Sequence, residues 1–264
     1  MRFDVITLFP ELFAPFLSAG INRRAFETGA VELKLWQLRD YADGTYRRVD
    51  DRPFGGGPGM VLLAEPLEKC LQAIRHDRAL KNPYEKPVPV VLFSPIGQPL
   101  NHAGVEEWSQ SDGSILICGR YEGLDQRFID AHVDVQVSLG DFVLSGGEIA
   151  AIALLDAVAR LQPGVLNDEG SHQMDSFNPA LDGLLDCGHF TRPEVWKDIT
   201  VPPVLMSGHH AEITKWRRQQ SLVLTLKYRP DLIVGARLAG KLSDQDENFL
   251  FSLSASGLVE SKSN

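Results

Sequence analysis

Two stretches of this chain hold residue types that could do chemistry. The first is the glycine-rich loop VSLGDFVLSGGE (Val137–Glu148), which lies between an apolar run and an alanine-rich segment. Glycines leave main-chain groups accessible, so such a loop can hold a small ligand, often a phosphate. The second is a polar stretch between Arg160 and Arg192, which contains five acidic residues and no lysine or arginine. A carboxylate there could act as a general base once the stretch orders around a substrate.

The glycine-rich loop does not match the common phosphate-binding motifs. The chain has no lysine between Lys86 and Lys197, which rules out a P-loop here, and the loop does not spell G-x-G-x-x-G. Ser145 and Glu148 instead have the spacing of a capping box, so we expect Glu148 to cap the following helix rather than to act as a catalytic acid. The loop therefore remains a candidate site for a small ligand without a phosphate.

A second glycine cluster, FGGGPGM (Phe54–Met60), follows a segment rich in arginine. Three glycines before a proline are typical of a surface turn. The alternative is a loop that contacts a phosphate backbone through Arg47, Arg48 and Arg52.

Charged pairs elsewhere leave two interpretations open. Asp156 and Arg160 have the i,i+4 spacing of an intrahelical ion pair, but Arg160 could also point from the helix end into a site under the glycine-rich loop. Cys187 and His189 lie close together, but no second pair at zinc spacing supports them, so we predict no metal site.

The composition limits the classes of protein to consider. The 264 residues carry a net charge of −9, yet residues 189–237 hold eight basic and four acidic side chains. That excess indicates either a solvated helix face or a surface that binds a polyanion. The odd number of cysteines, Cys70, Cys118 and Cys187, favours a reducing cytoplasm without disulfides. We find no signal peptide and no membrane span, and so expect a cytoplasmic protein without a membrane partner.

Hydrophobic patterning predicts the elements that must position these residues. Strands are expected at residues 3–9, 31–38, 88–94, 114–119 and 133–139, and helices at 11–26, 66–80, 102–109, 124–131 and 148–162. This alternation predicts an α/β domain with a mostly parallel sheet, in which ligands bind at the carboxyl ends of the strands. About thirty loop-like residues follow, and from Gly208 the pattern is helical again, with Ile213, Trp216, Leu222 and Leu226 forming an apolar stripe.

The chain resembles a known family in nine segments that occur in order. They are LFPELF, DDRPFGGGPGM, GRYEGLDQRFID, SLGDFVLSGGE, DAVARLQPGVL, DSF, GLLDC, HFTRPEVW and VPPVLMSGHHAEITKWR. This series is similar to the bacterial tRNA (guanine-N1)-methyltransferases, which modify the guanine directly 3′ of the anticodon. The chain departs from the family pattern between DSF and GLLDC, which are separated by a longer spacing around Asn178–Asp182.

The resemblance implies a fold that periodicity does not reveal. Residues 1–165 would form an α/β domain whose C-terminal part is a trefoil knot of the SPOUT type. Residues 166–188 would be a flexible interdomain lid and linker, and residues 189–264 a small helical domain that binds tRNA. A homodimer is implied, with tRNA bound across both protomers.

The resemblance also implies a methyl donor, S-adenosylmethionine, in a pocket made by three knot loops. By motif, the binding residues would be Ser94, Pro95, Gly119, Tyr121, Glu122, Ser138, Leu139, Gly140, Phe142, Leu144, Gly146 and Gly147. This donor carries no phosphate, which agrees with the missing P-loop lysine. The resemblance also implies a requirement for Mg²⁺, although the sequence shows no recognisable set of metal ligands.

Two residues would carry out the chemistry that the resemblance implies. Asp175, the aspartate of DSF, would remove the proton from guanine N1, and Arg160 would orient the guanine and stabilise the negative charge that develops on it. The modification would support maintenance of the reading frame. Alternative functions are methylation of a ribose 2′-OH or of rRNA by an enzyme with the same knot, RNA binding without catalysis, and a dinucleotide-dependent reaction.

Overall fold

The computed structural model describes residues 1–84, 86–166 and 171–255. The chain divides into two compact units, Met1–Asn167 and Asp168–Asn264, which we describe separately. No helix in the described ranges is long and apolar enough to cross a membrane.

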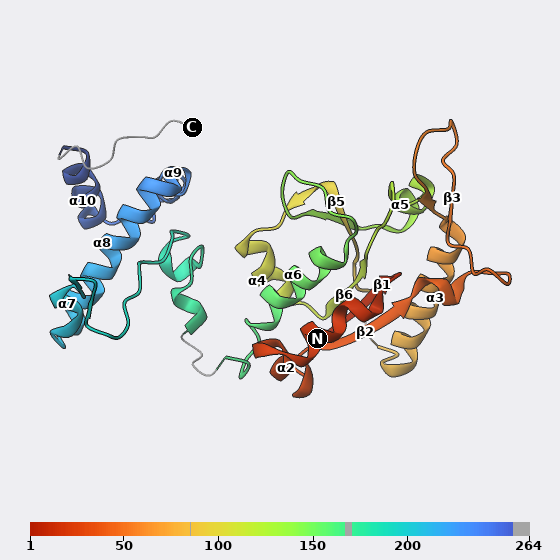
Figure 1. The fold of residues 1–264 in the computed structure, drawn as a ribbon, viewed down its shortest axis with the longest axis horizontal. Helices are drawn as coiled ribbons and strands as arrows, with labels where there is room; N and C mark the ends of the chain where they lie inside the picture. Colours follow the sequence, from red (N-terminus) through yellow and green to blue (C-terminus); the bar gives the residue numbers. More distant parts are fainter. Residues whose placement is uncertain (85, 167–170, 256–264) are drawn as a thin grey trace. The chain divides into compact units, whose positions relative to one another are not determined.

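The first unit is built on a five-stranded parallel sheet (Figure 1). Its strands are β1 (Arg2–Thr7), β2 (Glu32–Gln37), β5 (Val90–Pro99), β6 (Gly113–Ile117) and β7 (Val135–Ser138). They lie in the order β2-β1-β6-β5-β7, and every neighbouring pair is parallel. The α/β class and the parallel sheet predicted from the alternating pattern are therefore confirmed.

Helices cover both faces of this sheet. One face packs against α1 (Ala14–Ser18), α2 (Gly20–Glu27), α4 (His102–Ser109) and α6 (Glu148–Ala159). The opposite face packs against α3 (Ala64–Lys81) and α5 (Gln126–His132). The strand side chains alternate accordingly: Val5 and Leu116 belong to the first core cluster, whereas Ile6 and Ile117 belong to the second.

The first predicted helix is broken in the structure. Residues 11–26 were expected to form one helix, but the chain forms a 3-10 turn, η1 (Pro10–Phe13), followed by α1 and α2. Ala19 is extended, and Gly20 has a φ of +62°, which ends the helical path between the two short helices.

A small hairpin carries the second glycine cluster. After the 3-10 turn η2 (Leu38–Tyr41), strands β3 (Asp50–Asp51) and β4 (Val61–Leu62) pair antiparallel, and the segment FGGGPGM connects them. The Phe54 side chain in this connection is fully exposed. The surface turn predicted here is thus observed, while contact of its arginines with a phosphate backbone stays a prediction.

The second unit is mainly helical. Its described residues form two 3-10 turns, a two-stranded hairpin and four helices: η3 (Ser171–Met174), η4 (Pro179–Leu181), β8 (Val195–Trp196), β9 (Ile199–Thr200), α7 (Pro203–Met206), α8 (His210–Tyr228), α9 (Pro230–Leu238) and α10 (Asp244–Ala255). A small core joins α8, α9, α10 and the segment around Leu184 through Leu184, Leu222, Ile233, Ala236 and Leu250.

The described part of the polar stretch, residues 171–188, folds against α8. The Leu185 amide donates to Thr225 Oγ1 at 3.0 Å, and Ser221 Oγ donates to the Leu185 carbonyl at 2.5 Å. Arg218 Nη2 donates to Asp182 Oδ2 at 2.8 Å. These contacts, together with the buried Leu184, give order to a segment in which the sequence shows no periodic pattern. Residues 167–170 of the predicted linker lie outside the described ranges.

Candidate active site

Three loops meet at one edge of the parallel sheet. They follow or interrupt β6, β5 and β7, which are neighbours in the sheet, so the loops emerge side by side at the carboxyl ends of these strands. The β5 loop bulges out at residues 94–97, where the register between β5 and β7 shifts from Phe93 to Gln98. The β6 loop runs from Cys118 to Asp125, and the β7 loop from Leu139 to Gly147.

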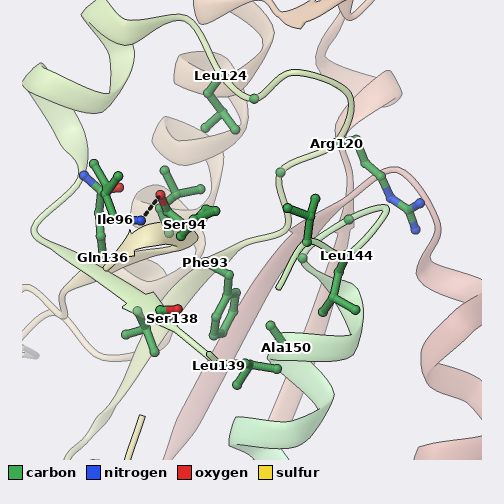
Figure 2. A pocket seen from close by; sticks show the side chains of 18 of the residues that line it. Phe93, Ser94, Ile96, Arg120, Leu124, Gln136, Ser138, Leu139, Leu144 and Ala150 are labelled. Atoms are coloured by element: carbon green, nitrogen blue, oxygen red, sulfur yellow. Dashed lines mark hydrogen bonds between the residues drawn. The ribbon is translucent and has the colours of Figure 1, made fainter. Parts of the chain in front are cut away.

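These loops enclose a cavity of about 440 Å³, a size typical of small-ligand sites. All twelve predicted binding residues line it: Ser94, Pro95, Gly119, Tyr121, Glu122, Ser138, Leu139, Gly140, Phe142, Leu144, Gly146 and Gly147. Figure 2 shows Phe93, Leu139 and Leu144 around the hollow, with Ala150 of α6 between Leu139 and Leu144. The structure thus brings the predicted residues together, while their role in binding a cofactor stays a prediction.

The loop backbones are held by local hydrogen bonds and by unusual dihedral angles. The Gly140 amide donates to Ser138 Oγ at 3.1 Å, and Gly140 has a φ of +148°. Tyr121 adopts a φ of +60°, which is uncommon for a residue with a side chain. Its aromatic ring is half exposed at the cavity rim. The cavity therefore presents an apolar body with main-chain polar groups at its edges, which suits a planar heterocycle.

The β7 loop returns to the β6 loop before α6 begins. The Gly147 amide donates to the Gly119 carbonyl at 2.9 Å, and Arg120 and Gly146 form an isolated antiparallel bridge. Two of the three cavity loops are therefore joined by backbone hydrogen bonding, at positions where the β7 loop has no side chains.

The capping box predicted for Ser145 and Glu148 is wrong. Helix α6 begins at Glu148, its N-cap residue is Gly147, and no side chain caps it. The Glu148 carboxylate is completely buried and turns to other partners: Thr7 Oγ1 donates to Oε1 at 2.8 Å, and Arg120 Nη2 lies 2.9 Å from Oε2. A buried carboxylate is stabilised more by a cation than by a backbone amide, which explains why the capping geometry is not adopted.

The thiol beneath the loops is not a nucleophile. Cys118 is 2% exposed, at the end of β6, and burial raises its pKa well above the usual range, with a further contribution from the charge of Glu148. Because the thiolate is the reactive form, Cys118 is an inert core residue at neutral pH.

The two predicted catalytic residues lie in different units. Arg160 is the C-cap residue of α6 and is half-buried in the first unit. The neighbouring Asp156 carboxylate accepts a hydrogen bond from the Asn22 side chain. In the second unit, the half-buried Asp175 lies in a turn that Asn178 closes. The backbone N–H of Asn178 donates to the Asp175 carbonyl at 3.2 Å, and the side-chain Nδ2 of Asn178 donates to the His172 carbonyl at 3.0 Å.

Among the described residues of the second unit, one group combines several types of metal ligand. The ligand atoms of Asp186, Cys187 and His189 lie within 4.8 Å of one another, and His189 Nε2 is 2.7 Å from Asp186 Oδ2. Burial, followed by the charge of Asp186, raises the pKa of the Cys187 thiol above its usual range. The group is best described as a hydrogen-bonded carboxylate and imidazole beside a buried thiol.

Sequence reasoning missed several residues of the cavity. Arg120 lies between two predicted residues in the segment GRYEG, and Leu124 and Gln136 also line the hollow. Arg120 could have been found from that segment, since an arginine among glycines at a strand end is unusual unless it has a partner. Its partner, Glu148, is the single charged residue in the first eight positions of α6.

Comparison with known proteins identifies the relatives of the chain. The family model described as "tRNA (Guanine-1)-methyltransferase TrmD" matches residues 1–235. A protein of Polaromonas sp. named tRNA (guanine-N(1)-)-methyltransferase is 69% identical over 253 residues, covering 96% of this chain and 97% of that protein. Proteins of the same name from Paracidovorax citrulli and Methylibium petroleiphilum are 66% and 62% identical and cover 96% and 98% of this chain, and 98% and 100% of their own lengths.

Proposed function

The chain belongs to the tRNA (guanine-1)-methyltransferase family, and from that premise we propose that it methylates N1 of the guanine directly 3′ of the anticodon, at position 37 of tRNA. The names of its relatives support an enzyme that acts on guanine N1 in tRNA. The position of that guanine and a role in maintaining the reading frame belong to the proposal. So does a cytoplasmic location.

The cavity at the ends of β5, β6 and β7 is the proposed site of S-adenosylmethionine. When bound, this cofactor supplies an electrophilic methyl group on a sulfonium. The residues present fit it: Leu139 and Leu144 offer apolar walls for an adenine, and half-buried backbone of the three loops borders these walls. This convergence of three loops on one cavity is the observation that carries the proposal.

Asp175 and Arg160 are the proposed catalytic residues. The carboxylate of Asp175 would accept the proton from guanine N1, and the guanidinium of Arg160 would bond to the guanine O6, where negative charge develops. Removing that proton makes N1 nucleophilic. The enzyme must also hold N1 in line with the methyl group, and such positioning can lower the activation barrier by up to roughly 7–11 kcal/mol in well-oriented reactions.

Five further features belong to the same proposal. A trefoil knot in the C-terminal part of the first unit rests on the family. A homodimer, the binding of tRNA by residues 189–264 and the linker role of residues 166–188 rest on the family. A requirement for Mg²⁺ rests on the family as well, and no described residue is assigned as its ligand.

The decisive experiment measures methyl transfer from S-adenosylmethionine to two tRNA transcripts that differ only at position 37. We expect labelling of the transcript with guanine and background labelling of the transcript with adenosine, with the methyl group mapped to N1. Methylation of both transcripts, or of a ribose 2′-OH, would show an enzyme with a different target. Failure of S-adenosylmethionine to bind in calorimetry would indicate an RNA-binding protein without this activity.

A further inference from the structure

We infer that Arg120 and Glu148 are positioning residues: the ion pair between the half-buried Arg120 and the buried Glu148 holds two of the three cavity loops in place for the methyl donor. This inference rests on the proposed function, because it assigns a task within the proposed donor site. Neither residue is among the predicted binding residues.

The Glu148 carboxylate forms the centre of this arrangement. It is completely buried at the start of α6, in a helix whose other early residues are alanine, isoleucine and leucine. Its two oxygens face different segments of the chain, since Oε1 accepts from Thr7 at the end of β1 and Oε2 lies 2.9 Å from Arg120 Nη2. One side chain therefore connects the end of β1, the β6 loop and the first turn of α6.

The Arg120 guanidinium fastens the β6 loop to the β7 loop. Its Nη1 donates to the Ser145 carbonyl at 3.2 Å, and the guanidinium carbon lies 4.5 Å from the centre of the Phe9 ring. The side chain crosses directly over Gly146, where an added Cβ would overlap Arg120 Nε. Gly146 therefore has no side chain because the arginine occupies that space.

The direction of the Arg120 side chain argues for positioning rather than for contact with the donor. Figure 2 shows the guanidinium turned away from the apolar side chains of the cavity. Arg120 belongs to the cavity lining, but the side chains that its guanidinium contacts, Phe9 and Glu148, do not. The charged group thus lies behind the loop whose backbone faces the ligand.

Stability alone is a weak reason to bury such a pair. The desolvation of two charges offsets much of their attraction, and well-packed apolar residues often replace a buried ion pair without loss of stability. The pair does supply connection: the Nη2–Oε2 contact, the Nη1 bond to the Ser145 carbonyl and the Thr7 bond to Oε1 join four segments of the chain, so the loops attached to them are held in one arrangement. A precise donor site needs that kind of support behind its binding residues.

The test compares two variants of the pair, Arg120→Lys and Glu148→Gln, with the control Arg78→Lys. For each full-length variant, calorimetry gives the affinity for S-adenosylmethionine and thermal unfolding gives Tm. Arg78 is a matched control, because it also forms a buried ion pair in the first unit, with its Nε 2.7 Å from Asp4 Oδ2, and does not line the cavity. We expect the Kd for the donor to rise at least about tenfold in the Arg120 and Glu148 variants. In Arg78→Lys, Tm falls while Kd stays within about twofold.

Steady-state kinetics separate positioning from general weakening. KM for S-adenosylmethionine should rise in Arg120→Lys while kcat at saturating donor stays within about threefold, because the reacting groups are untouched. Unchanged donor affinity in both site variants overturns the inference, as does an equal loss of affinity in Arg78→Lys. Arg120→Lys retains the charge opposite Glu148, so it serves if Glu148→Gln does not fold. Absence of donor binding by the unaltered protein would instead reject the proposed function.

Discussion

Gly147 packs directly on the backbone of Cys118: a Cβ added to Gly147 would come within 2.8 Å of the Cys118 Cα. Real Cβ atoms do not approach other atoms so closely, so the start of α6 can lie against the end of β6 only because residue 147 has no side chain. This contact fixes how closely the end of the β7 loop lies against β6 in the wall of the cavity.

Substitution of Gly147 by alanine is therefore expected to disrupt the cavity. The added methyl group meets backbone, which cannot turn aside as a flexible side chain can, so α6 must shift away from β6. Overpacking of this kind typically destabilises by about 1–3 kcal/mol. We expect a lower Tm in Gly147→Ala and at least tenfold weaker S-adenosylmethionine binding by calorimetry.

Gly104→Ala is the matched control in the same unit. Gly104 lies in α4, has an ordinary φ, and an added Cβ would meet its nearest neighbour, Asn101 Oδ1, at 3.7 Å. Alanine there should leave donor binding unchanged and raise stability by up to about 1 kcal/mol. Equal losses in the two alanine variants would contradict the role assigned to the Gly147–Cys118 contact.

Asp175→Asn tests the proposed general base. The amide keeps the size of the side chain but accepts a proton poorly, so we expect near-normal donor binding and methyl transfer slowed by at least about 10²-fold. Single-turnover methylation of a tRNA transcript measures the rate. Asp231→Asn, at an exposed carboxylate bonded to Arg229, is the control that should retain full activity. Full activity of Asp175→Asn would remove the assigned base.

We predict that the buried thiol of Cys70 makes the protein less stable at alkaline pH. Burial raises the pKa of this thiol to about 12, whereas the unfolded chain ionises near the ordinary value of 9.0. The unfolded state therefore releases its proton first, and the free energy of unfolding falls as pH rises from about 9 towards 12, by at most about 1.4 kcal/mol per pH unit for this group.

Denaturant titrations at several pH values between 8 and 10.5 can detect that slope. Cys70→Ala should reduce it, leaving the contributions of Cys118 and Cys187, whose pKa values burial also raises. Alanine also lowers stability at every pH by leaving a small void. Alkylation of the native protein at pH 9 should label Cys70 at least about 10²-fold more slowly than alkylation of the denatured chain. Rapid labelling of native Cys70 would be inconsistent with its burial.

Arg218 is expected to hold the segment around Asp182 on the second unit. Its guanidinium bonds to Asp182 and, through Nε and Nη2 at 3.0 Å, to the buried Asp246 of α10. Arg218→Met leaves that carboxylate without its cation, a loss of about 1–3 kcal/mol. Hydrogen exchange should become faster at the Leu184 and Leu185 amides.

The control for this prediction is the exposed ion pair of Arg237 with Glu247, whose atoms lie 2.7 Å apart. Exposed pairs contribute roughly 0–1 kcal/mol, so Arg237→Met should leave the exchange rates of Leu184 and Leu185 nearly unchanged. Similar acceleration in both variants would show that Arg218 has no special part in ordering the segment.

Much of the first unit follows from local sequence patterns. Apolar runs such as VPVVLFS and SILICG are long enough for buried strands and too short for helices, and turn residues follow each of them. Their alternation with helices leads to a parallel sheet, and a parallel sheet places its ligands at the strand ends. The positions of candidate loops could therefore be predicted from the strand ends, whereas the twelve binding residues were predicted from the resemblance to the family.

Other features could not be read from local patterns. The bend at Gly20 depends on a φ of +62° that a glycine permits but does not require. The order of residues 171–188 depends on Leu184, whose burial needs α8 and α9 in place. An isolated leucine in a polar stretch carries no periodic signal, so propensity alone predicts a loop.

Glu148 shows which features the local sequence determines and which it does not. Spacing with Ser145 correctly indicated that a helix starts here, because capping residues and helix starts are linked over three or four positions. The direction of the carboxylate was decided by Thr7, 141 positions away in the chain, and by Arg120, which the sheet brings to the same strand edge. The sequence determined the elements and their order through short-range preferences. The tertiary structure decided the partners of the buried Glu148 carboxylate. A carboxylate shielded from water is stabilised by whichever cation and hydroxyl the fold places beside it.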